Sequence, residues 1–366
     1  MNSIEKLMEG AVAQGIFPSA VLACGDTETL RYLQAFGNAV IDPPTPARTE
    51  TVYDLASLTK PLATAASLML LVQDGALGLD QPLGEIVSRF SRSDKAHITV
   101  RQLLGHTSGL PDWRPYYESL MRVPLERRRA ELCELLANEP LVYRPKEQTL
   151  YSDVGFLVLQ EVVEETAGSP LDEIFETRIC RPLGISSLFF RRLSESGAVE
   201  DGRQRDTGAG FAATEICPWR NRLLIGEVHD DNAHLLGGVA GHAGLFGTAR
   251  DAWLLVAELC RSFAGKPGKG LFNPNVVKAF FTVKPGPGSF VLGFDTPSRP
   301  GSSSGRYFSD LSVGHLGFTG VSFWADLEKK AIVILLSNRV HPARSREGIK
   351  HFRPVIHDAA MERFFL

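Results

Sequence analysis

The chain has 366 residues, of which 44% are hydrophobic and 22% are charged, as expected for a globular protein with a large core. The formal net charge is −3, from 39 basic and 42 acidic residues, so the composition excludes a strongly basic nucleic-acid-binding protein. The amino terminus lacks the apolar core of a signal peptide, and no apolar run reaches the length of a membrane span. We therefore expect a cytoplasmic protein with no transmembrane segment and no nucleic-acid partner.

The cysteines and histidines give no sign of a metal or disulfide framework. The five cysteines are widely spaced and contain no Cys-x-x-Cys pair. Residues 228–234, Val-His-Asp-Asp-Asn-Ala-His, include metal-capable side chains, but their pattern is typical of a polar loop. We expect neither a metal site nor a cofactor.

The first quarter of the chain mixes helix and strand patterns. Apolar residues spaced three and four apart predict a helix over residues 2–14. Two apolar runs separated by turn residues predict strands at 20–24 and 30–36. A segment rich in alanine and leucine then predicts a helix over 57–74, ended by Gly75.

The middle of the chain, from about 76 to 250, is mostly helical in pattern. Thr248 and Asp251 form an N-terminal capping pair for the helix predicted over 250–263. The predicted helices cover residues 98–105, 125–137, 154–167, 171–179 and 250–263. Near the carboxyl end the patterns predict strands at 317–326 and 331–337 and a closing helix at 355–365.

Strand patterns thus lie at both ends of the chain, with helices between them. This order predicts an α+β fold in which an antiparallel sheet is flanked by the N- and C-terminal helices and carries a large inserted helical region. We expect residues 1–75 and 250–366 to form the sheet region and 76–249 the helical region, within one interlocked catalytic unit.

Ser57 and Lys60 lie three residues apart at the start of a strongly apolar helix. At that spacing the two side chains share one helix face, so the amine can serve as the base that a serine nucleophile needs. A helix start and burial both disfavour an ammonium, so we expect the pKa of Lys60 to lie below its ordinary value of about 10.4. The same spacing at Ser3 and Lys6 lacks an apolar wall and is set aside.

Tyr151 and Asp153 immediately precede the helix predicted at 154–167. The Tyr151 phenol could relay a proton to a leaving group. The sequence is consistent with two interpretations of Asp153. It could simply cap the helix, or its carboxylate could pair with Lys60 and raise the lysine pKa.

Two His-x-Gly sequences are present, and their contexts differ. His315 precedes Gly317 at the expected opening of the first C-terminal strand, where a side chain can reach a substrate and glycine permits close approach. His242 lies in a glycine-rich run before a capped helix and is a candidate substrate contact. Context favours His315 as the site residue.

In this order, the serine–lysine, tyrosine and histidine motifs resemble those of the serine β-lactamase and penicillin-binding protein superfamily, and in particular the class C β-lactamase-like serine hydrolases. The resemblance extends from about residue 4 to 362. Further stretches typical of that family are Leu103–Leu110, Gly237–Phe246, Gly317–Gly320 and Ser337–Arg339.

The resemblance implies a role for each matching position. Ser57 would be the nucleophile that forms an acyl-enzyme, and Lys60 and Tyr151 would share the base and acid duties. His315 would replace a lysine that many members carry, and the backbone N–H groups of Ser57 and Phe318 would form the oxyanion hole. The site would lie in a cleft between the helical region and the sheet.

Two positions depart from the family pattern. Asp153 stands where the tyrosine motif often ends in asparagine, and His315 lacks the permanent charge of a lysine. Both changes favour an esterase, D-amino-acid peptidase or weak β-lactamase acting on a small ester, amide or peptide. The competing hypothesis is a non-catalytic binding protein that retains this fold. The sequence does not determine the oligomeric state.

Overall fold

The computed structural model describes residues 3–197, 199, 210–266 and 268–366, and its largest feature is a six-stranded antiparallel sheet built from both ends of the chain. The central pairing joins the first strand to the last, with Leu22 opposite Leu335. The strands, in sheet order, are β3 (Thr45–Pro46), β2 (Leu30–Val40), β1 (Ser19–Gly25), β11 (Ala331–Ser337), β10 (Ser322–Asp326) and β9 (Ser312–Leu316). The predicted terminal sheet is therefore confirmed.

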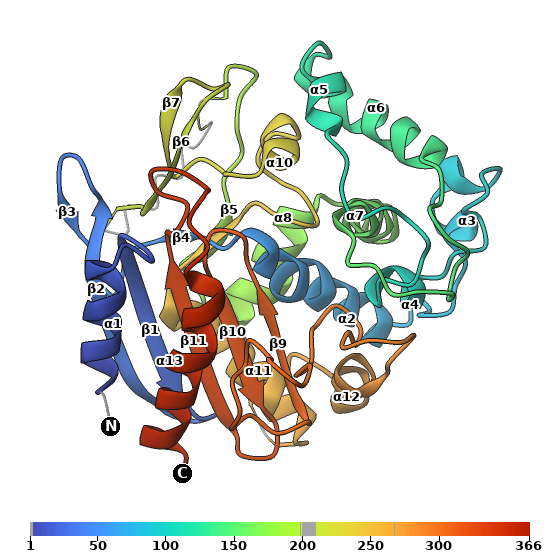
Figure 1. The fold of residues 1–366 in the computed structure, drawn as a ribbon. Coiled ribbons are helices and arrows are strands. Elements are labelled where there is room, and N and C mark those ends of the chain that lie inside the picture. Colours follow the sequence, from blue (N-terminus) through green and yellow to red (C-terminus); the bar gives the residue numbers. More distant parts are fainter. Residues whose placement is uncertain (1–2, 198, 200–209, 267) are drawn as a thin grey trace.

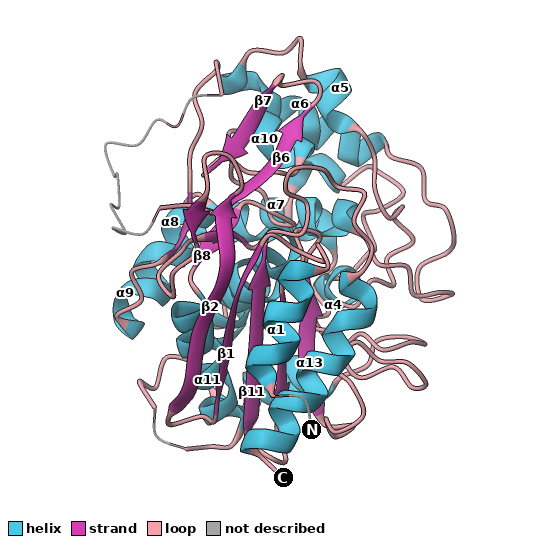
Figure 2. Cartoon of the chain, turned by 60° about the vertical axis from the view of Figure 1, so that its left-hand side comes forward, coloured by secondary structure: helices cyan, strands magenta, loops and turns pink. Residues whose placement is uncertain are grey.

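Helices cover both faces of this sheet (Figures 1 and 2). The terminal helices α1 (Ile4–Ala13) and α13 (Ile349–Phe364) lie side by side on one face and form a core with it. Helix α11 (Ala249–Phe263) packs on the other face, against β1 and β11. Every residue of β1 and β11 is buried, because both faces of these strands are covered.

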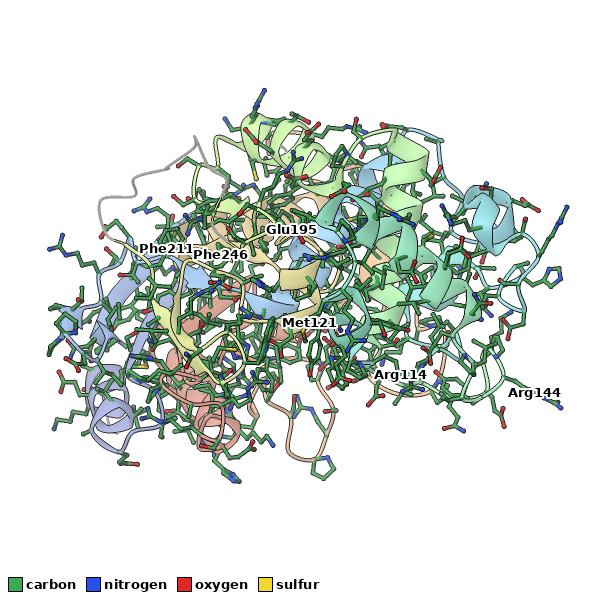
Figure 3. The ribbon with its side chains drawn as sticks, turned by 90° about the horizontal axis from the view of Figure 1, so that it is seen from above. Arg114, Met121, Arg144, Glu195, Phe211 and Phe246 are labelled. Carbon is green, nitrogen blue, oxygen red and sulfur yellow. The ribbon has the colours of Figure 1, made fainter. Side chains whose placement is uncertain are left out.

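The inserted region surrounds α7 (Asp153–Ala167), whose middle is buried in the larger core. Two small sheets accompany it: β4 (Tyr53–Asp54), β8 (Leu245–Gly247) and β5 (Leu188–Phe190), and the hairpin of β6 (Ala213–Cys217) and β7 (Arg222–Ile225). The rings of Phe211 and Phe246 pack edge to face at 5.8 Å beside them (Figure 3). Further helices are α3 (Leu83–Ile86), α4 (Val100–Leu104), α5 (Tyr116–Leu120), α6 (Leu125–Asn138), α8 (Leu171–Ile174), α9 (Arg181–Leu183), α10 (Asp231–Leu235) and α12 (Pro274–Thr282), and α2 (Ala66–Gln73) follows Ser57.

The helix predicted over 57–74 is built from three pieces. A 3₁₀ turn at Ala56–Leu58 leads into a π-helical stretch at Lys60–Ala65 and then into α2 (Ala66–Gln73). Pro61 lies at the start of the π-helical stretch, where its missing N–H disturbs the fewest helical hydrogen bonds. The predicted start near Ser57 is therefore correct.

The carboxyl-terminal strands differ from the prediction. Residues 317–321 form a turn, so the strand predicted at 317–326 is restricted to β10. The preceding strand β9 was not predicted, and His315 lies near its end instead of opening a strand. The closing helix α13 also begins earlier than predicted, at Ile349, and contains Pro354. Among the described helices, none has the length and apolar character needed to cross a bilayer.

Candidate active site

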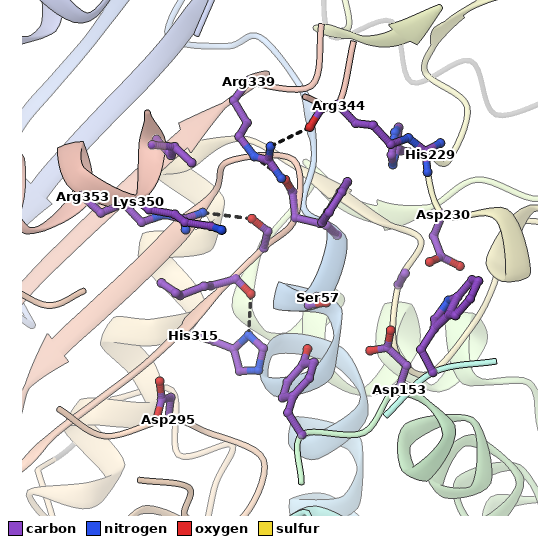
Figure 4. A pocket seen from close by; sticks show the side chains of 18 of the residues that line it. Ser57, Asp153, His229, Asp230, Asp295, His315, Arg339, Arg344, Lys350 and Arg353 are labelled. Carbon is purple, nitrogen blue, oxygen red and sulfur yellow. Dashed lines mark hydrogen bonds between the residues drawn. The ribbon is translucent and has the colours of Figure 1, made fainter. Parts of the chain in front are cut away.

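A cavity of about 670 Å³ opens where the start of the Ser57 helical segment meets the end of β9 and the loop before α7 (Figure 4). Six of the residues predicted from the sequence line it: Ser57, Tyr151, Asp153, His315, Gly317 and Phe318. Lys60, a seventh predicted residue, lies directly behind Ser57. The fold thus brings together side chains that are far apart in the sequence.

Asp54 holds the backbone turn that presents Ser57. One carboxylate oxygen accepts a hydrogen bond from the Ala56 N–H at 2.8 Å, and the other accepts one from the His229 N–H at 2.7 Å. Ala56 has a φ of 45°, in the left-handed region that non-glycine residues rarely adopt. Burial raises the pKa of the Asp54 carboxyl, although the two N–H donors act in the opposite direction. This aspartate therefore fixes a strained turn immediately before Ser57.

Lys60 is fully buried and contacts three groups of the site. Its Nζ lies 3.1 Å from Ser57 Oγ, 3.2 Å from the His242 carbonyl oxygen and 2.6 Å from Asp153 Oδ1. Burial favours the neutral amine, but the charge of Asp153 and the contacts of Lys60 with Asp153 and Tyr151 outweigh it, so the pKa of Lys60 is raised. The expected lowering is therefore wrong, and the alternative in which Asp153 pairs with Lys60 is the one observed.

Tyr151 has an aromatic and cationic environment. Lys60 Nζ lies 4.8 Å from the centre of its ring, and the rings of His106 and His315 lie at 4.8 Å and 5.8 Å. Burial raises the pKa of Tyr151, against the charge of Lys60 and its hydrogen bonding with Lys60 and Ser57. The phenol is therefore protonated at neutral pH and can act as a proton donor.

His315 is neutral and presents a hydrogen-bond acceptor. Its Nδ1 lies 2.8 Å from the Leu316 carbonyl oxygen, which can only accept, so Nδ1 carries the proton. Nε2 is buried and has no hydrogen-bond partner within the described residues. Burial, together with the charges of Lys60 and Arg353, lowers the pKa of His315 to about 3. This histidine does not supply the positive charge of the lysine it would replace.

The turn after β9 carries Phe318 between two flat groups. The His229 ring stacks on it at 5.7 Å, and the Arg339 guanidinium lies 4.6 Å from its centre. Gly317 is required at the neighbouring position, because a Cβ there would lie 2.3 Å from Val321 and 2.9 Å from the Leu55 carbonyl oxygen. The Thr319 hydroxyl donates to the Asp54 carbonyl oxygen at 2.7 Å and ties this turn to the Ser57 segment.

The His242 side chain lies behind the cavity wall, in contrast to the substrate contact that we expected. It is buried, and its Nε2 lies 2.9 Å from Asp230 Oδ1. The proximity of His242 lowers the pKa of Asp230, against the effect of burial. His242 therefore reaches the site through its carbonyl oxygen, which contacts Lys60, and not through its ring.

Four residues of the site region were not identified from the sequence. Asp54 and Arg353 have no motif that marks them, and Arg339 lies in the family-typical stretch Ser337–Arg339 but was given no role in the site. His106 lies in the family-typical stretch Leu103–Leu110, but it was given no role in the site. Its Nδ1 accepts a hydrogen bond from the Ser152 N–H at 3.0 Å, and burial and nearby charges hold its pKa well below the ordinary value. It thereby positions the segment that carries Tyr151 and Asp153.

This fold, with a serine and a lysine at the head of a buried helix beside an antiparallel sheet, is that of β-lactamase-fold hydrolases. Comparison with known families agrees: the model of the Beta-lactamase family matches residues 4–356. The chain therefore belongs to the Beta-lactamase family.

Individual relatives agree with this assignment. A protein of Escherichia coli K12 named "Putative D-alanyl-D-alanine carboxypeptidase" is 30% identical over 93% of this chain and 82% of its own length. The solved structure of EstCE1, a hydrolase with promiscuous acyltransferase activity, matches 98% of this chain and 97% of its own at a TM-score of 0.75 and 22% identity. The structure of the octameric penicillin-binding protein homologue of Pyrococcus abyssi matches 98% of this chain and 76% of its own, at a TM-score of 0.74 and 20% sequence identity. These structures share the fold with this protein.

Proposed function

We propose that this protein is a serine hydrolase that forms an acyl-enzyme on Ser57 and cleaves small esters, amides or peptides. The observation that carries the proposal is the contact of Ser57 Oγ with Lys60 Nζ at 3.1 Å, with Asp153 a further 2.6 Å away, at the wall of an open cavity. A serine is activated when a positioned base can take its proton. Membership of the Beta-lactamase family supports the same chemistry.

Asp153 gives Lys60 a way to act as a base despite its raised pKa. In the resting ion pair Lys60 is an ammonium and cannot accept a proton. When its proton moves along the 2.6 Å contact to Asp153, the neutral amine can take the Ser57 proton. The serine oxygen then bonds to the substrate carbonyl carbon, and the carbonyl electron pair moves to oxygen. The carbonyl then re-forms, the bond to the leaving group breaks, and Tyr151, protonated at rest, gives its proton to the leaving group. In the second half of the reaction a water molecule attacks the acyl carbon and gives a proton to the Tyr151 phenolate. The bond to Ser57 Oγ breaks as the serine regains its proton from Lys60, and Lys60 regains its own from Asp153.

The backbone N–H groups of Ser57 and Phe318 are the donors we assign to the developing oxyanion. Within the described residues neither N–H donates to a carbonyl oxygen of the chain, and both residues line the cavity. Preorganised donors of this kind stabilise a tetrahedral intermediate more than the ground state. The Thr319 contact with Asp54 keeps the two donors in a fixed relation.

The substrate preference follows from the groups that replace the family pattern. His315 offers a neutral acceptor at Nε2, and Asp153 is occupied by Lys60. Neither group provides the fixed cation or the amide donor on which efficient β-lactam binding would depend. The names of the relatives, a carboxypeptidase and a hydrolase with acyltransferase activity, also fit ester or amide substrates.

A comparison of two chromogenic substrates tests this function. We expect hydrolysis of p-nitrophenyl acetate by the wild-type protein, a much slower reaction with the cephalosporin nitrocefin, and loss of both in Ser57→Ala. Equal ester hydrolysis by the wild type and Ser57→Ala would contradict the proposal. Nitrocefin turnover faster than that of the ester would retain the nucleophile but contradict the substrate preference.

A further inference from the structure

Residues 228–234, the polar run noted in the sequence, form a loop that borders the cavity and turns into α10. Each of the four titratable side chains in this run has a protein partner. His229 lies 3.0 Å from Glu215, Asp230 2.9 Å from His242, Asp231 2.8 Å from Arg220, and His234 3.1 Å from Glu227. The second of these pairs also contacts the proposed base, because the His242 carbonyl oxygen accepts a hydrogen bond from Lys60 Nζ at 3.2 Å.

The Asp230–His242 pair is held rigidly beside the cavity. His242 is 1% exposed, and its Nε2 lies 2.9 Å from Asp230 Oδ1. The same carboxylate oxygen accepts a hydrogen bond from the Ala233 N–H at 2.8 Å and caps α10. Burial opposes the ionisation of Asp230, but the proximity of His242 and these hydrogen bonds lower its pKa, so the carboxylate is anionic at neutral pH. An anionic carboxylate can only accept, so His242 Nε2 is the donor.

The backbone on both sides of His242 is tied to the helical segment that carries the lysine. The Gly241 carbonyl oxygen accepts a hydrogen bond from Thr64 Oγ1 at 2.6 Å. The Leu245 N–H donates to Thr59 Oγ1 at 3.1 Å. The ring of His242 adds a contact in another direction, to the loop before α10. Its carbonyl oxygen is therefore fixed from two separate parts of the molecule.

This carbonyl oxygen limits the directions in which Lys60 can accept a proton. Nζ has three neighbours, which are Ser57 Oγ at 3.1 Å, Asp153 Oδ1 at 2.6 Å and the His242 oxygen at 3.2 Å. An ammonium directs an N–H at each of them, whereas a neutral amine has two N–H groups and one lone pair. A carbonyl oxygen only accepts, so the position that faces it is occupied by an N–H in both states. The lone pair is left to face Ser57 or Asp153, the two groups between which the proton passes.

We propose that Asp230 and His242 are positioning residues that orient Lys60 for proton transfer. The inference rests on the proposed function, because it gives the pair a role in the base step of that reaction. The Asp230 carboxylate, on the same side of the cavity as Asp153, holds the His242 ring (Figure 4). The ring fixes its own backbone carbonyl, and the carbonyl keeps one N–H of Lys60 in place. A residue that only filled space would not need a proton donor facing a buried carboxylate, since burying such groups costs free energy.

His242→Leu tests this role, because leucine fills the site but cannot donate to Asp230. We expect kcat for p-nitrophenyl acetate to fall about tenfold while KM changes little, since a misaligned base slows both halves of the reaction. His242→Gln, whose amide can still donate to Asp230, should recover most of the loss. If His242→Leu does not fold, Asp230→Asn takes its place, because it keeps the shape and removes the charge, and kcat should again fall.

The matched control is His234→Leu. His234 belongs to the same polar run and lies 3.1 Å from the Glu227 carboxylate, but it does not line the cavity. This change should lower the stability of the same region and leave kcat and KM unchanged. Urea unfolding compares the stability of the two variants, so that a loss of kcat can be separated from a loss of folded protein.

A double mutant tests whether the pair acts through the lysine. In a Lys60→Ala background His242→Leu should cause no further loss of the single-turnover rate, because the group that it positions is absent. A further fall as large as that in the wild type would overturn the inference. Equal losses of kcat in His242→Leu and His234→Leu would overturn it as well.

The failure of this inference is distinguishable from that of the proposed function. If Ser57→Ala and Lys60→Ala lose activity while His242→Leu keeps the wild-type kcat, the function stands and the positioning role is wrong. If Ser57→Ala hydrolyses the ester as fast as the wild type, the proposed function itself is wrong.

Discussion

The charged side chains on the two sides of the cavity have different kinds of partner. On the side of the helical region, the buried Lys60 forms an ion pair at 2.6 Å with Asp153, which lines the cavity. On the side of the sheet, His315 is neutral, and Arg339 and Arg353 donate hydrogen bonds to backbone carbonyl oxygens. Proton transfer requires fixed partners of opposite charge, whereas recognition requires donors and acceptors that remain open. We therefore assign the chemistry to the first side and substrate selection to the second.

Removal of the lysine should have the largest effect on this comparison. Lys60→Ala deletes the group that contacts Ser57 Oγ and leaves Asp153 without its partner. We expect kcat/KM for p-nitrophenyl acetate to fall about a thousandfold, in the range of a lost general base. Lys278→Ala, at an exposed position of α12, is the control and should not change the rate. A residual rate within tenfold of wild type would place the base elsewhere.

The pH dependence of kcat/KM tests the Asp153–Lys60 ion pair itself. Asp153→Asn removes the charge that raises the pKa of Lys60, so burial will favour the neutral amine. We expect the alkaline rise of kcat/KM for a neutral ester to move by at least about one unit to lower pH.

Tyr151→Phe identifies the group that titrates in this profile. If Lys60 is the titrating base, Tyr151→Phe lowers the rate but keeps the alkaline rise at nearly its wild-type pH. If the alkaline rise of kcat/KM shifts in Tyr151→Phe but keeps its wild-type pH in Asp153→Asn, the titrating base is the Tyr151 phenol and not Lys60.

The Asp54 turn should give an intermediate effect. In Asp54→Asn one of the two carboxylate acceptors becomes an NH₂ donor, which faces the Ala56 or the His229 N–H. We expect kcat to fall about tenfold with little change in KM, and the free energy of unfolding to fall by about 1–3 kcal/mol. Rates and urea unfolding measure the two effects. A change in stability without a change in kcat would make Asp54 a structural residue only.

The smallest expected effect is the loss of folding stability at acidic pH. Burial lowers the pKa of His315 to about 3 and that of His357 to about 4, while an unfolded histidine titrates near 6.5. Between these values the unfolded chain binds more protons, so the free energy of unfolding should fall as pH decreases below about 6.5. His357→Gln, outside the cavity, should make this decline shallower between pH 4.5 and 6.5. An unchanged slope in thermal or urea unfolding would contradict the buried, neutral state.

The fold was predictable where the sequence pattern is local and strongly apolar. Strands β1 and β11 are uniformly buried, and their apolar runs identified them. Strand β9 was missed because its sequence, Ser-Val-Gly-His-Leu, has only two strongly apolar residues. Its strand conformation depends on pairing with β10, which is a tertiary contact that the segment alone does not encode.

The motif residues of the site were predictable from the sequence, whereas the contacts that position them and set their pKa values were not. Ser57, Lys60 and Tyr151 carry recognisable spacing, and the fold places them together. The direction of the Lys60 pKa could not be decided, because it depends on whether the distant Asp153 caps a helix or pairs with the amine. Arg339 belongs to a family-typical stretch, but its role depends on contacts made only in the folded chain.

The central claim is that Ser57 forms a covalent acyl-type adduct, and intact-protein mass spectrometry tests it most directly. The wild-type protein and Ser57→Ala are each treated with a fluorophosphonate and digested to locate the modification. We expect one adduct on wild type, on the peptide that contains Ser57, and none on Ser57→Ala. Equal labelling of the two proteins, or an adduct on another residue of the wild type, would contradict the account.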